Sequence, residues 1–149
     1  HRVDRRQRQM CIRDSSMGTY VVAQLIKAMT KKRIQVQDSR VLVMGLTFKE
    51  NCPDLRNTRV VDIIHELAEY NINVDVYDPW VDPEECEREY GIKPIQSLAE
   101  GVYDAIILAV GHHQFKALGA AKIHATGKPE HVLYDLKYLF DESETDLRL

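Results

Sequence analysis

The sequence lacks a long hydrophobic run. A membrane-spanning helix needs roughly 18–20 apolar residues in succession, whereas the longest apolar run here extends only from Ala105 to Val110, a length that suits a buried strand. No apolar core of the kind found in signal peptides lies near the start. We therefore expect a soluble, cytoplasmic protein with no membrane partner.

Cysteine is also scarce. Cys11, Cys52 and Cys86 form an odd, widely spaced set with no C-x-x-C pair. A disulfide framework uses paired cysteines, and a structural zinc site uses closely spaced ones. The cysteine pattern therefore argues against both, and we predict no metal site.

An excess of positive charge is absent as well. The chain has 20 basic and 23 acidic residues, a net charge of −3, so it lacks the electrostatic footprint of a nucleic-acid-binding protein. Residues 1–14 differ from the rest, because five Arg and two Asp give them a local charge of +3. This segment has no helical or strand period. We interpret residues 1–15 as a basic extension, disordered or foreign to the domain that follows.

The remaining pattern predicts one α/β domain. A length of 149 residues suits a single domain, and strands that alternate with helices are typical of a doubly wound, mostly parallel sheet. We predict a Rossmann-like three-layer sandwich preceded by an N-terminal helix. The expected strands are Arg40–Phe48, Asn73–Asp78, Ile92–Ile95 (as a short edge strand), Tyr103–Val110 and His131–Asp135. The expected helices are Met17–Lys32, a helix capped by Thr58 with apolar residues from Val60 to Ala68, Pro83–Tyr90, Gln114–Leu118 and Ala120–Ala125.

In an open parallel sheet, ligands bind beyond the carboxyl ends of the strands. The loop after the first strand, Gly45–Thr58, carries one aromatic side chain and two cations at this edge. Phe48 can stack on a base, Lys49 can reach sugar hydroxyls or a phosphate, and Arg56 can bind phosphate oxygens. The alternative is that both cations form surface ion pairs with acidic neighbours in the same loop. The residue types alone leave these two interpretations equally supported.

Several other chemical sites are disfavoured by spacing. Only Gly45 follows the first strand, so the G-x-G-x-x-G fingerprint of a dinucleotide site is absent, and Asp78 is interpreted as a turn residue before Pro79. Cys52 has no base at an evident spacing, which favours a non-catalytic thiol. We interpret the adjacent pair His112 and His113 as loop or cap residues rather than metal ligands.

The loop just described carries a resemblance to a known family. The run GLTFKENCPDLRNT at 45–58, the run VYDPWVD at 76–82 and the run LYDLKYL at 133–139 resemble the C-terminal domain of the UDP-glucose/GDP-mannose dehydrogenase family. They are most similar to the branch that acts on UDP-N-acetylhexosamines in the biosynthesis of surface polysaccharides of the Vi and O-antigen type. The resemblance runs from about residue 16 to residue 149.

The resemblance implies roles for individual residues. Family members combine an N-terminal NAD-binding domain, a central helical dimerisation region and a C-terminal domain that binds the nucleotide sugar, and they oxidise the C6 alcohol of the sugar to a carboxylate with NAD. By this resemblance Phe48, Lys49 and, more weakly, Lys137 contact the UDP-sugar, and Arg56 reaches NAD. The family's catalytic cysteine, lysine, asparagine and aspartate belong to parts that this sequence does not match, so no catalytic residue is expected here.

We therefore expect a UDP-sugar-binding fragment of an NAD-dependent UDP-N-acetylhexosamine 6-dehydrogenase, inactive alone and dimeric or larger when full length. Its expected parts are the extension 1–15, a connecting helix in 16–39 and the binding domain 40–149. The apolar side of the connecting helix is expected to be exposed at Val21, Leu25 and Ala28. One alternative is a stand-alone nucleotide-binding or regulatory module. A receiver-like signalling domain is disfavoured. It needs an acidic cluster at the end of its first strand and a phosphorylatable aspartate at the end of its third, where this sequence has residues 45–49 (GLTFK) and 110–113 (VGHH).

Overall fold

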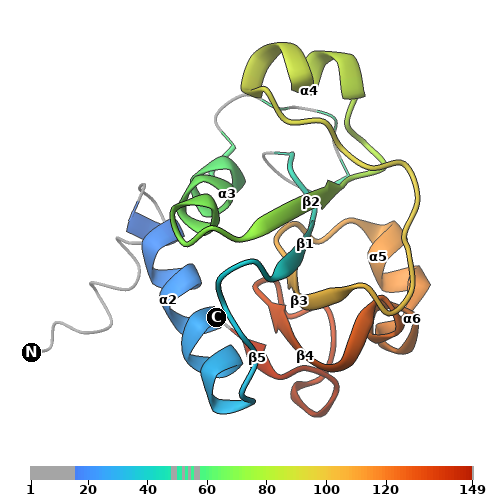
Figure 1. Ribbon diagram of the computed structural model, residues 1–149. Coiled ribbons are helices and arrows are strands. Elements are labelled where there is room, and N and C mark those ends of the chain that lie inside the picture. The colour runs from blue at the N-terminus through green and yellow to red at the C-terminus, as the bar shows by residue number, and fades with distance from the viewer. Residues whose placement is uncertain (1–15, 48–49, 52, 54, 56–57, 149) are drawn as a thin grey trace, which may run out of the picture.

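The computed structural model describes residues 16–47, 50–51, 53, 55 and 58–148, and its centre is a parallel β-sheet (Figure 1). The five strands lie in the order β2-β1-β3-β4-β5, and every neighbouring pair is parallel. Their bounds are Arg40–Met44 for β1, Asn73–Tyr77 for β2, Tyr103–Leu108 for β3, Gly127–Asp135 for β4 and Leu147–Arg148 for β5. The prediction of a mostly parallel sheet with β3 at its centre is confirmed.

Helices cover both faces of this sheet, as predicted for a three-layer sandwich. Helices α2 and α3 lie on one face, and α5 and α6 lie on the other (Figure 1). Their bounds are Ser16–Lys31 for α2, Val60–Glu69 for α3, Pro83–Tyr90 for α4, His113–Leu118 for α5 and Ala120–Ala125 for α6, followed by a 3₁₀ turn, η1, at Glu142–Glu144. No helix in the described part of the chain is long and apolar enough to cross a membrane.

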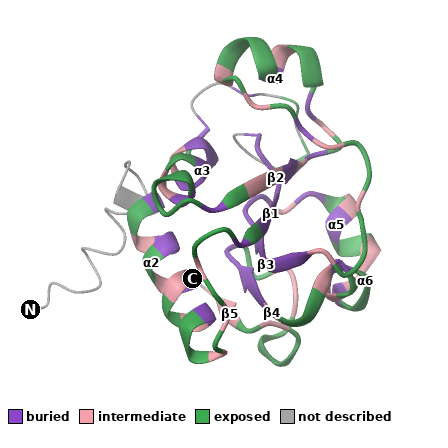
Figure 2. Cartoon of the chain, viewed as in Figure 1, coloured by how far each residue is buried: buried purple, intermediate pink, exposed green. Residues whose placement is uncertain are grey.

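The pleat of β1 divides the core into two layers. Val41 and Val43 belong to the cluster under α2 and α3, whereas Leu42 and Met44 belong to the cluster under α5 and α6. All four side chains are fully buried, because successive residues of a strand point to opposite faces and both faces are covered by helices. Figure 2 shows the buried strands β1 and β3 between helices that expose their outer sides.

Helix α2 is part of the same core. Val21 and Leu25 are fully buried, so the expectation that this helix leaves them exposed is wrong. A Cβ atom at Gly18 would lie 2.7 Å from the backbone oxygen of Asp62 in α3. The absence of a side chain at position 18 therefore lets the backbones of α2 and α3 approach closely, and α2 buries its apolar face against its own chain. The three-part division of the chain stays a prediction.

Local signals set the ends of several elements. Helix α4 begins after Asp82, whose side chain accepts a hydrogen bond from the Glu84 amide, and ends at Gly91 in the left-handed conformation. Strand β1 stops at Met44 rather than Phe48, and Gly45 follows it with φ +102°. A residue with a side chain is strained at this φ, so Gly45 is the position at which the chain leaves the sheet.

The structure corrects two predictions about strands. Residues 92–95 form no strand; a single hydrogen bond joins the Ile95 amide to the Val76 carbonyl, 2.8 Å away. Strand β4 begins at Gly127 rather than at His131. Gly127 pairs with Tyr103 and Val132 pairs with Ala105, so the residues 128–131 are inserted opposite the single residue Asp104. The short strand β5 was not anticipated from the sequence.

Candidate functional site at the carboxyl edge of the sheet

The segments that follow β1 to β4 meet at one edge of the sheet. The Gly45 amide donates to the Tyr77 carbonyl at 2.9 Å, which joins the ends of β1 and β2. The Ala109 amide donates to the Met44 carbonyl at 2.9 Å, and the Leu136 amide donates to the Leu108 carbonyl at 3.1 Å. This edge is where a doubly wound fold binds ligands.

A buried carboxylate lies at the centre of this edge. The Asp78 side chain is fully buried and accepts hydrogen bonds from the amides of Leu46 at 2.6 Å, Thr47 at 3.1 Å and Trp80 at 2.8 Å. It also lies 3.0 Å from Nε2 of His112. Burial alone would raise the pKa of Asp78, but the hydrogen bonds from His112 and from the Leu46 and Trp80 amides hold that pKa below its ordinary value.

The contacts of His112 define its tautomer. The backbone N–H of Asn51 donates to Nδ1 of His112 at 2.8 Å, so that nitrogen carries no proton. The ring proton is therefore on Nε2, which faces Asp78 Oδ2 at 3.0 Å and Thr47 Oγ1 at 3.2 Å. The His112 ring is fully buried, and it connects the loop after β1 to the loop after β2.

Asn51 is held by two successive histidines. Its backbone amide binds His112, and its side-chain oxygen accepts from the backbone N–H of His113 at 2.8 Å. The same oxygen lies 2.8 Å from Nδ1 of His113. Thr47 and Asn51 flank positions 48 and 49 in the sequence, and both are fixed to the edge of the sheet through Asp78 and His112.

The far end of the same loop is fixed independently. The Thr58 hydroxyl donates to the Leu46 carbonyl at 2.6 Å and accepts from the Val60 amide at 3.2 Å. Thr58 thus binds the first turn of α3 as predicted, although Arg59 occupies the N-cap position. The Tyr90 hydroxyl of α4 donates to the Leu55 carbonyl. The described residues between Leu46 and Thr58 are therefore attached to the loop after β2 through Asp78, to the loop after β3 through His112 and to α4 through Tyr90.

Trp80 extends the network across the edge. Its indole N–H donates to Oε1 of Gln114 in α5 at 2.9 Å, and its ring centroid lies 6.1 Å from those of both His112 and His113. The half-buried indole therefore packs beside the two histidines and presents an aromatic surface at the carboxyl edge.

Most of the predicted binding residues cannot be placed. Phe48, Lys49 and Arg56 lie outside the described residues, as does Cys52. Lys137 is described: it is exposed after β4, and its backbone N–H donates to Asp135 at 3.0 Å. A Cβ atom at Gly111 would lie 3.7 Å from the Lys137 Cβ, so Lys137 adjoins the loop after β3, at the same edge of the sheet as Asp78.

Sequence reasoning missed the roles of Asp78 and His112. Asp78 does form the predicted turn, since it accepts from the Trp80 amide, but it is also the centre of the buried network. His112 is the N-cap residue of α5, as predicted, but its side chain makes no cap hydrogen bond. The ring is instead fully buried in the network around Asp78. The one available signal was that both residues follow apolar strands of the same sheet.

The described residues do not form a dinucleotide site of the usual kind. An acidic residue after the second strand binds the ribose in such sites, but both oxygens of Asp78 are occupied by protein donors and the side chain is fully buried. A single glycine, Gly45, follows β1. Among the residues that the structure describes, neither Gly45 nor Asp78 therefore supplies the pyrophosphate cradle or the ribose carboxylate of a usual dinucleotide site.

Cys86, the one cysteine in the described residues, is a free thiol in the core. Burial, with smaller effects of Asp78 and Glu85, raises its pKa to about 11. A thiol with so high a pKa is a poor nucleophile at neutral pH, so Cys86 belongs to the packing of α4.

Comparison with known proteins identifies relatives of this domain. The model of the UDP-glucose/GDP-mannose dehydrogenase family, UDP binding domain, matches residues 42–142. A UDP-N-acetyl-D-glucosamine 6-dehydrogenase of Pseudomonas aeruginosa is 65% identical over 136 residues, and one of Salmonella typhi is 56% identical; each alignment covers 91% of this chain and 32% of the relative. The chain thus spans about a third of the length of these curated relatives.

A solved structure supports the fold. The NDP-N-acetyl-D-galactosaminuronic acid dehydrogenase from Methanosarcina mazei Go1 superposes with a TM-score of 0.76 at 22% identity, over 87% of this chain and 27% of that one. At this identity the likeness concerns the fold alone.

Proposed function

We propose, from the premise that this chain belongs to the UDP-glucose/GDP-mannose dehydrogenase family as its UDP binding domain, that it binds the nucleotide part of a UDP-N-acetylhexosamine. The bound sugar is oxidised at C6 from alcohol to carboxylate when the rest of the enzyme is present. The two relatives described above are named for UDP-N-acetyl-D-glucosamine, which makes this the first substrate to test. Such a reaction supplies uronic acids for surface polysaccharides.

The observation that supports this proposal is the anchoring of the loop after β1. Thr47 and Asn51 are fixed by Asp78 and His112, and Thr58 is fixed to the Leu46 carbonyl. Anchors on both sides of a binding segment reduce the conformational entropy that is lost when a ligand binds. We propose that Phe48 and Lys49 contact the UDP-sugar at the carboxyl edge, with Lys137 from the neighbouring loop.

NAD is the proposed cofactor of the whole enzyme. The described edge does not form a dinucleotide cradle, so the part of the relatives beyond this chain would hold NAD, with Arg56 reaching it from this side. When bound, NAD accepts hydride from the substrate; the residues of this chain bind and orient the nucleotide. We also propose that the full-length enzyme is a homodimer or larger and acts in the cytoplasm.

The proposal is tested on the 149-residue chain by NMR. UDP and UDP-N-acetyl-D-glucosamine should shift the amide resonances of Thr47, Asn51 and His113 with weak affinity, whereas NAD should leave them unchanged. Phe48→Ala and Lys49→Ala should each abolish the shifts. Lys27→Ala, at an exposed position of α2, removes the same charge elsewhere and should have no effect. The epimeric nucleotide sugar, UDP-N-acetyl-D-galactosamine, is the second ligand to titrate.

Three outcomes would contradict the proposal. Absence of shifts at millimolar UDP would exclude a uridine site at this edge. Tight binding of the UDP-sugar by the chain alone would favour a stand-alone binding module, because a site shared between two domains binds weakly when one is missing. Sustained formation of NADH by this chain would show that the catalytic groups are present within it.

A further inference from the structure

Two histidines and an aspartate converge at the opposite edge of the sheet. His124 lies in the last turn of α6, His131 lies in β4 just before the continuously paired run Val132–Asp135, and Asp146 directly precedes β5. One ligand atom from each of the three lies within 4.8 Å of the other two. His131 and Asp146 come before the paired residues Val132–Asp135 of β4 and before β5. Because these strands are parallel, the cluster lies toward their amino-terminal side, away from the carboxyl edge that holds Asp78.

The hydrogen bonds of the two rings turn their lone pairs toward each other. His124 Nε2 lies 2.7 Å from the Glu144 carbonyl, and His131 Nδ1 lies 2.6 Å from the Lys128 carbonyl. A carbonyl oxygen only accepts, so each of these nitrogens donates. The remaining nitrogens, His124 Nδ1 and His131 Nε2, are acceptors in neutral rings, and they face each other at 2.7 Å. Two such lone pairs repel unless a cation lies between them.

This arrangement is the one that metal-binding histidines adopt. A histidine ligand donates its second ring N–H to a carboxylate or a backbone carbonyl, which fixes the tautomer and directs the free lone pair at the metal. Both His124 and His131 meet this condition through backbone carbonyls. The carboxylate of Asp146 supplies a third ligand of a type that zinc accepts.

The backbone around His131 is adapted to hold its ring. A Cβ atom at Gly127 would lie 2.5 Å from Cγ of His131 and 2.8 Å from its Nδ1. The ring therefore occupies space that any residue other than glycine would fill. The inserted residues 128–131 of β4 place the Lys128 carbonyl against Nδ1, so the irregularity of this strand and Gly127 together set the position of the imidazole.

Asp146 is positioned by two donors. Its Oδ2 accepts from the Leu133 amide at 2.8 Å, and its Oδ1 lies 2.9 Å from the ammonium of Lys32, which also donates to the His131 carbonyl at 2.7 Å. The lysine keeps the carboxylate ionised and in place, and its positive charge lowers the affinity for a second cation. The site therefore favours a metal that imidazole binds strongly over a hard cation such as Mg²⁺.

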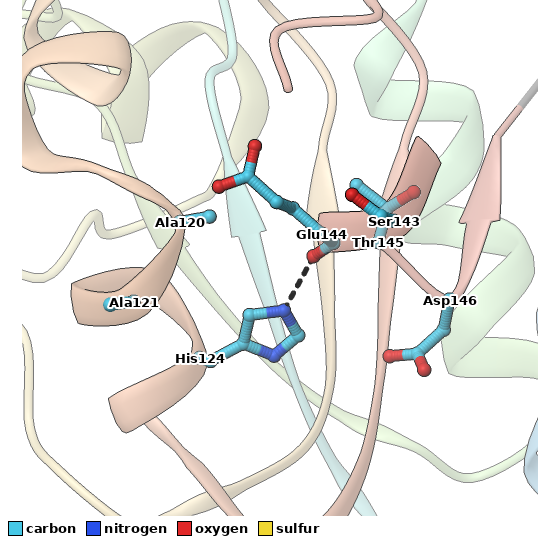
Figure 3. Close-up of a pocket in the computed structure, with 7 residues that line it drawn as sticks. All are labelled: Ala120, Ala121, His124, Ser143, Glu144, Thr145 and Asp146. Atoms are coloured by element: carbon cyan, nitrogen blue, oxygen red, sulfur yellow. Dashed lines mark hydrogen bonds between the residues drawn. The ribbon is translucent and has the colours of Figure 1, made fainter. Parts of the chain in front are cut away.

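We propose that His124, His131 and Asp146 form a binding site for a divalent transition metal, represented by Zn²⁺. At Zn–N distances of about 2.0–2.1 Å, a tetrahedral ion needs its two nitrogens about 3.3 Å apart, so the rings must separate by about 0.6 Å from their present contact. His124 and Asp146 also line an open pocket of about 330 Å³ between α6 and residues 143–146 (Figure 3). Water or an anion from this pocket can complete the coordination.

The bound ion would have a structural role. It would join α6, β4 and the segment before β5, three elements that otherwise meet through hydrogen bonds at this corner. This role is independent of the proposed uridine site, because the residues concerned lie at the other edge of the sheet. Failure of one proposal therefore leaves the other unaffected.

The test is calorimetric titration of ZnCl₂ into the metal-free, untagged 149-residue chain. We expect one saturable site, at least tenfold weaker in His124→Gln and in His131→Gln. His65→Gln replaces an exposed histidine of α3 and should bind as the original chain does. Gly127→Ala retains all three ligands but displaces the His131 ring, so it should also weaken binding. MgCl₂ should give no heat of binding.

Cobalt substitution identifies the ligands if a histidine variant fails to fold. Co²⁺ in the original chain should show the visible bands of a tetrahedral site without a thiolate charge-transfer band. A thiolate band would assign the metal to cysteine and overturn the proposal. Unchanged zinc affinity in folded His124→Gln and His131→Gln would also overturn it. Absence of zinc binding would do the same, and would leave a proton shared between the rings as the cause of their contact.

Discussion

Replacement of Asp78 by asparagine tests whether the buried carboxylate holds the edge of the sheet together. The side chain is fully buried and accepts from three backbone amides and from His112. The substituted asparagine is expected to keep its carbonyl oxygen toward Leu46, Thr47 and His112, since three of the four donors lie on that side. Its NH₂ group then faces the Trp80 N–H, and two donors oppose each other.

The magnitude follows from these contacts. A hydrogen bond to a charged group contributes about 1.5–3 kcal/mol and one between neutral groups about 0.5–1.5 kcal/mol, so three weakened bonds cost about 3 kcal/mol together. The unpaired Trp80 amide adds about 1–3 kcal/mol. Relief of the buried charge offsets part of this cost. We expect a net loss of about 3 kcal/mol, or a fall in Tm of roughly 6–12 °C for a domain of this size.

Urea unfolding monitored by circular dichroism measures this loss directly. Asp38→Asn is the matched control, because Asp38 is exposed at φ +67°, a conformation that asparagine tolerates, and it should change stability by less than about 0.5 kcal/mol. NMR of Asp78→Asn should also show displaced Thr47 and Asn51 amide resonances. A loss below about 0.5 kcal/mol, with both resonances unmoved, would refute the role assigned to the carboxylate.

Three further predictions follow from buried or strained positions. Gly45→Ala should destabilise the fold by at least about 2 kcal/mol in urea unfolding, because φ is +102° and the new Cβ would lie 2.6 Å from Cβ of Val110; equal stability would contradict the close approach. The pKa values of Asp78 and Asp146 are lower in the folded protein than in the unfolded chain, where they are near 4. The two ionised carboxylates therefore stabilise the fold above about pH 4, and this stabilisation should be lost as the pH falls through their folded-state pKa values. A free energy of unfolding that stays constant from pH 5 to pH 2 would contradict this. With the other two cysteines replaced by serine, Cys86 should react with a thiol reagent at pH 8 only at the rate of unfolding; immediate reaction would show that the thiol is accessible.

Sequence alone determined the features that depend on neighbouring residues. Helix α4 is capped by Asp82 at its start and by Gly91 at its end, as predicted, because a side-chain cap and a left-handed glycine act within one helical turn. The position of β3 at the centre of the sheet followed from its uninterrupted apolar run, since a strand covered on both faces does not alternate between apolar and polar residues. The resemblance of residues 45–58 to a known family was likewise a property of contiguous residues.

Only the tertiary structure decided which distant residues meet. Asp78 and His112 are separated by 34 positions, and neither carries a local signal of the other. His124, His131 and Asp146 converge because residues 128–131 are inserted into β4 and because β5 adds to the sheet beside it. Sequence period reports which face of an element is buried, but not which side chains oppose each other across two elements. That pairing depends on strand order and register, which are set by the packing of the whole chain.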